Sequence, residues 1–311
     1  MNEQITRRQH YVRKKYLLSW TGSNGQLWAS RGDKVFPASP DNVLHERDFY
    51  RLETLNEEEK RLLHLFMGNN EVLTKLNQGW LEENQAICML LQLLAGSSED
   101  ARMLLIQCGE EMQSMFERGA EMQCNALLAG NIDFWEDEEQ KTNFLLYLCQ
   151  QLFRSKNMRD RMINLVNKAS KETRIQNVSG ERVWKVLQYI LMTNLAYNLG
   201  VLNSFKLILL ENSTELKLIT GDQPVVNLCV DLKENGEPKT LIMYYPLSPT
   251  RAIVLTEAAP KSGIRYNLKE EEVDLLNRRI ADETEFSLVA NSEELIKRYL
   301  ASQNKINRFT A

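Results

Sequence analysis

The sequence predicts an α+β fold, in which strands from both chain ends form a mixed or antiparallel sheet beside a large helical middle lobe. Three observations support this prediction. Short runs of aromatic and β-branched residues, separated by turn sequences, occupy both ends of the chain. The middle carries apolar residues at helical spacing. Strands segregated from helices along the chain are typical of the α+β class.

These patterns divide the chain into three parts. Residues 1–55 form an N-terminal β meander, residues 56–203 a helical lobe, and residues 204–311 a β-rich region with two helices. Because a two-stranded hairpin alone is marginal in water, we expect the N-terminal meander to join the C-terminal sheet. The helical lobe then resembles an insertion between them.

The N-terminal part opens with residues 10–20, whose aromatic and branched side chains favour a strand. The turn sequence TGSNG follows, and residues 26–30 and 35–37 are predicted as two more short strands. Together they predict a small meander.

The helical part begins near Asn56, a favoured capping residue followed by three glutamates in the first turn. Residues 86–94 are apolar nearly all round, which predicts a central helix. Residues 99–127, 138–152, 157–173 and 180–202 are predicted as further helices. The many methionines between residues 89 and 122 are expected to fill a core or an interface.

The C-terminal part returns to strands after residue 204. The residues 234–237, Glu-Asn-Gly-Glu, form a strong hairpin signal. Helices are predicted over 269–281 and 293–302, with a short strand at 285–291 between them.

Composition narrows the function classes. The net charge is −4, so nucleic acid would be bound by a local basic patch rather than by the whole surface. No signal peptide or apolar stretch long enough to span a bilayer is visible, so we expect no membrane association. Five scattered cysteines without a CxxC pair favour the cytoplasm, and a zinc site is not expected. Motifs of P-loop ATPases, Rossmann dehydrogenases, α/β-hydrolases and zincins are absent.

Several short sequence blocks follow one another in an order that spans nearly the whole chain. They lie at His10–Val12, Tyr16–Leu17 with Trp20, Gln26–Trp28, Asp48–Tyr50, Gln151–Ser155, Ile219–Val225, Tyr245–Pro249 and Leu276–Asn277. This ordered set resembles the HYVP-motif family, domain of unknown function 4238 (DUF4238). Arg13 stands where that family has proline, and Gly221 stands where it has serine. The resemblance implies a mainly prokaryotic family and carries over no established activity.

Three residues in these blocks are the candidate catalytic groups. His10 is suited to general acid–base chemistry near neutral pH, or else bonds a backbone carbonyl in the sheet. Arg154 can clamp a phosphate or carboxylate with its planar guanidinium, or else be a solvated charge. Asp222 lies at a strand end beside Gly221, where it would orient a base or bind metal, or else cap its own turn.

A loose metal-site pattern also involves Asp222. With Asp231 and Lys233 it resembles the spacing of PD-(D/E)xK nucleases, in which two carboxylates hold Mg²⁺ and the lysine assists. The pattern arises often by chance, and Lys233 runs directly into the predicted turn. Mg²⁺ bound by Asp222 and Asp231 is the one cofactor that the sequence suggests.

The densest basic cluster lies at the N-terminus, at Arg7, Arg8, Arg13, Lys14 and Lys15. Cations interleaved with Tyr11 and Tyr16 suit RNA or single-stranded DNA. The alternative is an edge strand whose charges prevent strand pairing. If the first interpretation holds, the substrate contacts are expected at Tyr11, Arg13, Lys14, Thr220 and Lys233.

Two functions of different classes follow. The first is a nuclease-like, phosphodiester-directed effector of bacterial antiphage defence or a toxin system, with His10, Asp222 and Arg154 as its catalytic groups. The second is a non-catalytic protein that binds a partner, or itself, through the helical lobe. In that case the motif blocks hold the two chain ends together.

Overall fold

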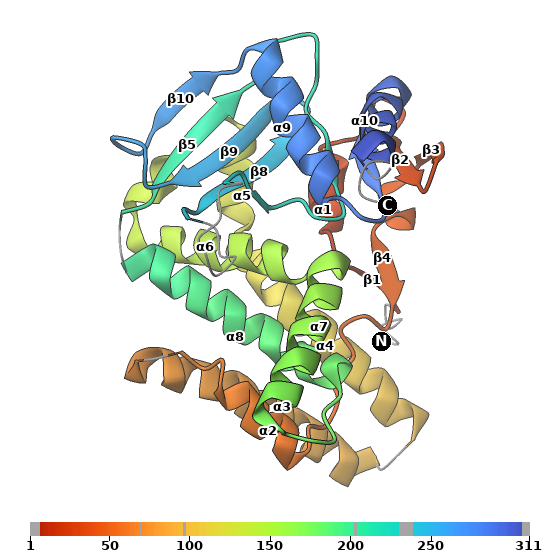
Figure 1. The fold of residues 1–311 in the computed structure, drawn as a ribbon, viewed down its shortest axis with the longest axis vertical. Helices are drawn as coiled ribbons and strands as arrows, with labels where there is room; N and C mark the ends of the chain where they lie inside the picture. The colour runs from red at the N-terminus through yellow and green to blue at the C-terminus, as the bar shows by residue number, and fades with distance from the viewer. Residues whose placement is uncertain (1–6, 69, 96–97, 202–203, 230–238, 307–311) are drawn as a thin grey trace. The chain divides into compact units, whose positions relative to one another are not determined.

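The computed structural model describes residues 7–68, 70–95, 98–201, 204–229 and 239–306. The chain forms two compact units, each assembled from segments distant in sequence (Figure 1). The helical unit comprises residues 1–11, 45–119 and 145–201, and the sheet unit comprises residues 12–44, 120–144 and 202–311. The expected turn at 234–237 lies outside the described residues.

The helical unit contains two short strands and long helices. Its elements are β1 (Arg8–His10), β4 (His45–Arg47), α2 (Glu57–His64), α3 (Glu71–Ala95), α4 (Glu99–Gly119), α7 (Lys156–Thr173) and α8 (Gly180–Val201). The second part of α6 (Glu138–Phe153) also belongs to it. Asn56 caps α2 as the sequence predicts, in a reciprocal pair of hydrogen bonds with Glu59.

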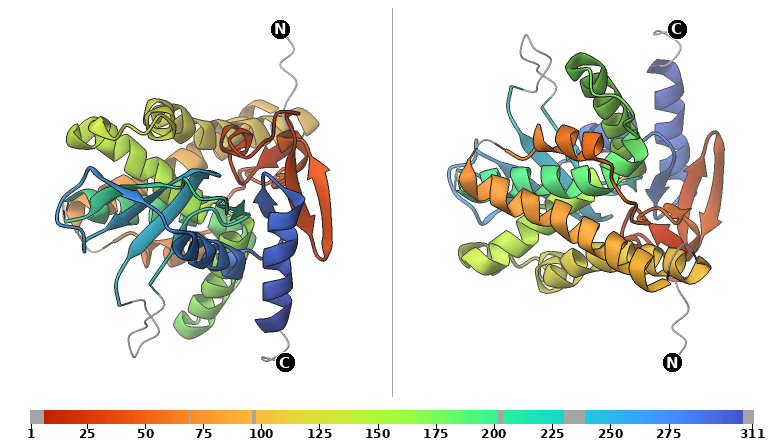
Figure 2. Two further views of the ribbon diagram at one scale, coloured as in Figure 1. Left: turned by 90° about the horizontal axis from the view of Figure 1, so that it is seen from above. Right: turned by 90° about the horizontal axis from the view of Figure 1, so that it is seen from below.

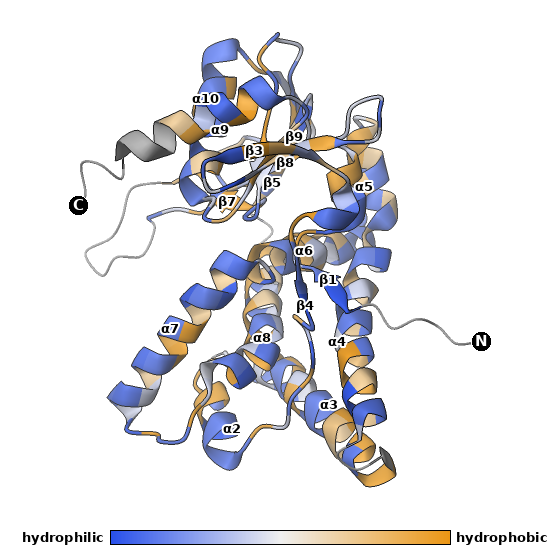
Figure 3. Cartoon of the chain, turned by 90° about the vertical axis from the view of Figure 1, so that its right-hand side faces the viewer, coloured by the Kyte–Doolittle hydropathy of each residue, from blue (hydrophilic) through white to orange (hydrophobic). Residues whose placement is uncertain are grey.

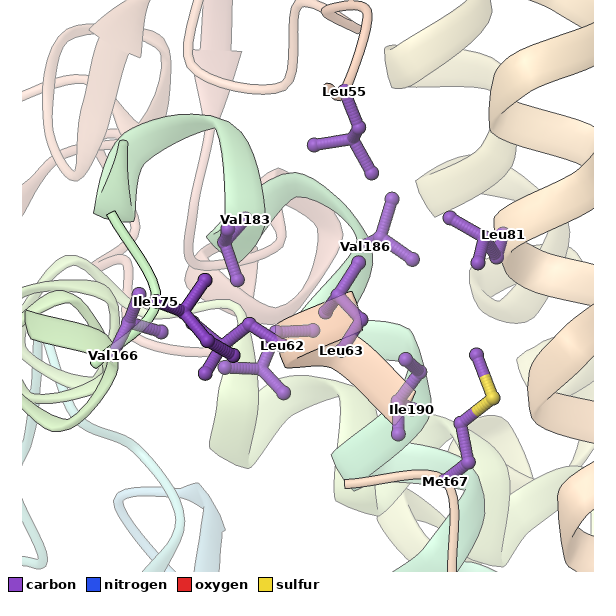
Figure 4. Close-up of a cluster of buried hydrophobic side chains, with 11 residues drawn as sticks. Leu55, Leu62, Leu63, Met67, Leu81, Val166, Ile175, Val183, Val186 and Ile190 are labelled. Carbon is purple, nitrogen blue, oxygen red and sulfur yellow. The ribbon is translucent and has the colours of Figure 1, made fainter. Parts of the chain in front are cut away.

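Helix α8 is the centre of this unit, since most of its side chains are buried. Helices α3 and α7 both pack along it, and Figure 2 (right) shows α3 and α8 side by side. The core lies where α2, α3, α7 and α8 meet, and Figure 4 shows Leu62, Leu63, Leu81, Val166, Val186 and Ile190 converging there. The predicted helical middle is therefore confirmed.

The end of α3 differs from the prediction of a central helix. Met89, Leu90, Leu93 and Leu94 are each more than half exposed. Figure 3 shows hydrophobic residues at this end of the helix. An all-round apolar sequence usually indicates burial, but here only Cys88 and residues nearer the start of α3 face the core.

The sheet unit contains a five-stranded sheet in the order β10-β5-β9-β8-β7. Its strands are β5 (Lys206–Glu211), β7 (Val226–Asn227), β8 (Ile242–Ser248), β9 (Arg251–Thr256) and β10 (Ile264–Asn267). All neighbours are antiparallel except β10 and β5, which are parallel. Helix α5 (Glu121–Leu128) and a 3-10 turn at Asp133–Glu136 precede α6 in this unit.

A second, four-stranded sheet has the order β3-β2-β11-β6. It joins β2 (Leu27–Arg31) and β3 (Lys34–Ala38), from the start of the chain, to β6 (Thr220–Gly221) and β11 (Leu288–Ala290), from its end. Helix α9 (Glu270–Glu283) packs on β6, and α10 (Glu293–Ile306) packs along β2, β3 and β11 (Figure 2, left). The prediction of a sheet built from both chain ends is confirmed.

Residues 14–18 correct the expected first strand, because Lys14–Leu18 forms the helix α1. Tyr16 and Leu17 in this helix are buried, and so is Trp20, two residues beyond its end. The aromatic and branched composition of this segment favours a strand, but the segment forms a short helix that buries Tyr16 and Leu17.

Within the part of the chain that the structure describes, no helix is long and apolar enough to cross a bilayer.

Candidate functional site

Strands β1 and β4 form a two-stranded antiparallel ribbon in the helical unit. Its register pairs Arg8 with Arg47, Gln9 with Glu46, and His10 with His45. Side chains alternate between the two faces of a strand, so the middle pair points to one face and the two outer pairs point to the other. Figure 3 shows both strands as hydrophilic.

The middle pair anchors the ribbon to the helices. Gln9 is fully buried; its Nε2 donates to the Ile106 carbonyl at 3.0 Å, and its Oε1 accepts from the Tyr50 amide at 2.6 Å. Glu46 binds Lys156 at 3.1 Å and Arg159 at 2.9 Å. These bonds to α4 and α7 fix which face of the ribbon is turned away from the helices.

The outer pairs therefore give the opposite face four cationic or imidazole side chains. Arg8 and Arg47 are exposed, and His10 and His45 are partly exposed with ring centroids 5.5 Å apart. No acidic group among the described residues lies within ion-pair distance of Arg8 or Arg47. We call this set, Arg8, His10, His45 and Arg47, the cationic face.

Most of the predicted N-terminal basic cluster is already paired with acids. Arg7 donates two hydrogen bonds to Asp48, which lowers the pKa of that carboxyl. In the sheet unit, Arg13 lies 3.7 Å from Glu121 and Lys14 lies 2.5 Å from Asp41. Lys15 also binds Glu121. Arg13 and Lys14, both expected to contact substrate, therefore already have carboxylate partners.

Arg154 is fully buried and joins three of the motif blocks. Its Nε donates to the Tyr50 hydroxyl at 2.9 Å, its Nη1 to Glu117 at 2.5 Å, and its Nη2 to the His10 carbonyl. The Tyr50 hydroxyl also donates to the His10 carbonyl, at 3.3 Å. All three nitrogens of the guanidinium are thus engaged, and they hold the backbone of His10 in place.

A carboxyl group beside this arginine has an unusual pKa. Burial raises the pKa of Glu110 to about 7, with a smaller opposing effect from the charge of Arg154. Its Oε2 is buried, and no hydrogen-bond partner for it exists among the described residues. Gln113 and Gln150 continue this polar layer, since Gln150 Nε2 donates to Gln113 Oε1 at 2.8 Å.

Asp222 belongs to the sheet unit, where its carboxylate is fully buried. Oδ2 accepts from the Phe286 amide at 2.7 Å, and Oδ1 accepts from the Glu285 amide at 3.2 Å. Burial raises the pKa of Asp222 to about 7, although these backbone bonds oppose the shift. The carboxylate therefore fixes the backbone of Glu285 and Phe286, which precede β11.

Thr220 and Asn277 also hold neighbouring motif blocks together in this unit. The Tyr16 hydroxyl is 2.6 Å from the Thr220 hydroxyl and 2.7 Å from the Pro246 carbonyl. Asn277 Oδ1 accepts from the Ile219 amide at 2.9 Å. Both networks fix the short strand β6, which carries Thr220.

The remaining predicted positions add little to a site. Tyr11 is buried, with its ring 5.5 Å from the ring of Phe49. Asp231 and Lys233 lie outside the described residues. His10 and Arg154 lie together in the helical unit, while Thr220 and Asp222 belong to the sheet unit.

The suggested Mg²⁺ ligands fit poorly with what the structure describes. Both oxygens of Asp222 already accept backbone amides, and binding a cation there would compete with those bonds. Across the described residues, no three His, Cys, Asp or Glu side chains gather closely enough to hold a metal ion. The Asp222 carboxylate therefore fits a role in holding the backbone better than a role as a metal ligand.

Comparison with known families finds that residues 8–294 match a family model described as "Protein of unknown function (DUF4238)". The chain belongs to the DUF4238 family. No curated protein and no solved structure matches it. The resemblance drawn from the sequence is thereby confirmed, and the function of this DUF4238 protein has to be argued from its own geometry.

In this DUF4238 chain, the sequence motifs indicate His10 and the N-terminal basic cluster includes Arg8, but His45 and Arg47 were not predicted as members of a site. His45 and Arg47 immediately precede the Asp48–Tyr50 block, and that proximity was the available signal. Their alignment with Arg8 and His10 depends on strand pairing across more than thirty residues. Glu110 was missed because it looks like an ordinary helix glutamate.

Proposed function

We propose that this protein is a nuclease-like, phosphodiester-directed enzyme that contacts nucleic acid through the cationic face. The observation that carries the proposal is the register of β1 and β4, which aligns Arg8 with Arg47 and His10 with His45. We further propose that it acts in the cytoplasm as an effector of bacterial antiphage defence or a toxin system.

Two arginines directly opposite each other are unfavourable on a bare strand pair, because like charges repel across the ladder. A bound anion removes that penalty. Arginine is also the side chain whose planar fork best matches phosphate oxygens. The exposure of Arg8 and Arg47 leaves both guanidinium groups available for this contact.

The histidines supply the second requirement of a phosphodiester reaction, which is proton transfer. An imidazole accepts or donates a proton near neutral pH, and His10 and His45 share the face with the arginines. Phosphate-binding arginines thus lie beside histidines that can transfer a proton. Arg154 contributes by holding the His10 backbone rather than by binding phosphate itself.

Binding and cleavage are tested on labelled tRNA, single-stranded RNA, single-stranded DNA and duplex DNA, each with Mg²⁺ and with EDTA. The test variant is Arg8→Ala with Arg47→Ala, and the matched control is Arg61→Ala, which removes an exposed arginine from α2. We expect the double variant to weaken binding and to lower the slope of log affinity against log salt by about 1.4, for two lost phosphate contacts to a single strand.

Unchanged binding and cleavage in the double variant would remove the cationic face from the function. Failure of the native protein to bind or cleave any of the four nucleic acids would refute the proposed function as a whole.

One observation favours the second candidate, a protein that self-associates through the helical lobe. Met89, Leu90, Leu93 and Leu94 lie on neighbouring positions of α3, since residues four apart share a helix face. Sedimentation of the native protein and of Leu93→Glu tests this candidate. A concentration-dependent dimer that the substitution dissociates supports it, and a native monomer at all concentrations excludes it.

A further inference from the structure

We infer that His45 is the catalytic partner of His10 and that the substrate is RNA, cleaved by attack of its own 2′-hydroxyl group. This inference rests on the proposed function and specifies its substrate and its chemistry. His45 belongs to none of the motif blocks, although it lies just before the Asp48–Tyr50 block.

The geometry of the two rings supports a pair that acts on one phosphate. His10 and His45 are directly opposite each other in the antiparallel register, and their ring centroids are 5.5 Å apart with planes inclined at 74°. Both side chains are partly exposed on the same face. A phosphodiester lying across this face brings two different oxygens within reach of two different imidazoles.

The backbone beneath the pair is held in place. The His10 carbonyl accepts hydrogen bonds from Arg154 and from the Tyr50 hydroxyl. On the neighbouring strand, Glu46 is tied to Lys156 and Arg159 on α7. A reacting pair has to be positioned to within a fraction of an ångström, and these partly buried bonds provide that support on both strands.

Two imidazoles match the proton requirements of RNA transphosphorylation. One neutral imidazole removes the proton from the 2′-hydroxyl, and the 2′-oxygen forms a new bond to phosphorus. The bond from phosphorus to the 5′-oxygen breaks, and the other imidazole, in its protonated form, donates a proton to that leaving oxygen. The products are a 2′,3′-cyclic phosphate and a free 5′-hydroxyl, so atoms and charge balance without a co-reactant.

The arginines complete the arrangement. Negative charge accumulates on the non-bridging oxygens while phosphorus has five substituents, and Arg8 and Arg47 form the neighbouring pair on the same face, two residues along each strand. DNA lacks the 2′-hydroxyl, so this chemistry discriminates RNA from DNA at the step of bond formation rather than of binding.

The test uses an RNA oligonucleotide, the same oligonucleotide with 2′-deoxy sugar at the cleaved position, and the matching DNA. Mass spectrometry identifies the ends that are formed. We expect 2′,3′-cyclic phosphate ends, cleavage in EDTA, and no cleavage at the 2′-deoxy position. These readouts use the native chain and do not depend on the folding of any variant.

Single variants then assign the pair. His10→Gln and His45→Gln are each expected to lower the cleavage rate by about 10²–10⁴-fold, the usual contribution of a general acid or base. The matched control is His64→Gln, which alters the remaining histidine, exposed on α2. We expect this control to cleave at the native rate.

The outcomes separate this inference from the proposed function. Cleavage of DNA, or products with 5′-phosphate ends, would support the proposed nuclease function but would refute cleavage by attack of the 2′-hydroxyl. A native cleavage rate in His45→Gln would refute the role of His45 as the catalytic partner of His10. Absence of both binding and cleavage for every nucleic acid would remove the proposed function itself.

Discussion

The guanidinium of Arg154 donates to the hydroxyl of Tyr50 across 2.9 Å, and both side chains are fully buried. Tyr50 is the last residue of the block that follows β4, while Arg154 belongs to the block at residues 151–155. The Arg154 guanidinium also lies over the Tyr50 ring, with Cζ 5.4 Å from the centroid. Two motif blocks about a hundred residues apart are thus joined by one contact.

Replacing Arg154 is expected to destabilise the protein strongly. Arg154→Ala removes the cation that pairs with Glu117 and one of the two donors to the His10 carbonyl, and breaking such a buried pair costs about 3–5 kcal/mol. Tyr50→Phe removes the acceptor of Nε and a long hydrogen bond to the His10 carbonyl, and it should cost about 1–3 kcal/mol. Urea unfolding of both variants and of the double variant measures the coupling between them.

The control for this series is Arg61→Ala, whose exposed side chain lies 3.9 Å from Glu58. We expect its unfolding free energy to change by less than about 0.5 kcal/mol. If Arg154→Ala were as stable as this control yet inactive, Arg154 would be a phosphate-binding residue rather than a support for His10.

Gly109 allows α4 to approach the backbone of Tyr50. A Cβ atom at this position would lie only 1.9 Å from the Tyr50 carbonyl oxygen. Alanine normally stabilises a helix interior, but here Gly109→Ala is expected to destabilise the protein by about 1–3 kcal/mol or more. Thermal and urea unfolding measure the change.

The matched substitution is Gly79→Ala in α3, where a Cβ atom would meet no other atom within 4 Å. It should stabilise the protein by about 0.5–1 kcal/mol. Equal effects of the two substitutions would show that the close approach at Tyr50 costs nothing.

How far the sequence predicts the structure depends on the distance over which the information acts. The cap at Asn56 was predicted because it is local. The sheet that joins β2 and β3 to β11 was predicted because an isolated hairpin needs a partner. The five residues of α1 were mistaken for a strand, because their composition favours β structure and only their packing shows the helical face.

The candidate site shows the same limit. His10 was found through its motif, whereas His45 became visible only when the register of β1 and β4 was known. A shift of that register by one residue would point His45 to the other face. Arg154 was predicted as a candidate catalytic group from its motif. The sequence did not reveal that its partners are Tyr50, Glu117 and a backbone carbonyl.

Stability between pH 5 and pH 7 is expected to depend on Glu110. Burial raises the pKa of its carboxyl to about 7 in the folded chain, whereas an unfolded glutamate titrates near pH 4.3. The folded state therefore binds the additional proton in this range. Its stabilising effect is complete below about pH 4 and is lost as the pH rises through 7.

Glu110→Gln should remove this loss and raise the unfolding free energy at pH 8 by about 1–3 kcal/mol, since one pKa unit corresponds to about 1.4 kcal/mol. The control is the neighbouring Glu111→Gln, because an exposed hydrogen bond from Arg118 lowers the pKa of Glu111. Urea unfolding from pH 5 to pH 8 compares the two. An unchanged pH dependence in Glu110→Gln would mean that another group, such as Asp222, dominates.

Asp222 is the residue for which structural and catalytic roles predict the most different results. Asp222→Ala leaves the amides of Glu285 and Phe286 without acceptors, each at a cost of about 1–3 kcal/mol, so unfolding should become easier by about 2–5 kcal/mol. Asp222→Asn keeps one acceptor oxygen and should lie between the alanine variant and the native chain. Urea unfolding measures both, with Asp282→Asn on the exposed surface of α9 as the control.

Cleavage assays of the same variants measure whether the Asp222 carboxylate takes part in the reaction. Because its carboxylate is committed to two backbone amides, we expect Asp222→Asn to retain RNA cleavage at temperatures where it remains folded. A variant that keeps the native unfolding free energy but loses a Mg²⁺-dependent cleavage would contradict this expectation. That result would instead give Asp222 a metal-binding role and would require the Glu285 and Phe286 amides to be released when the cation binds.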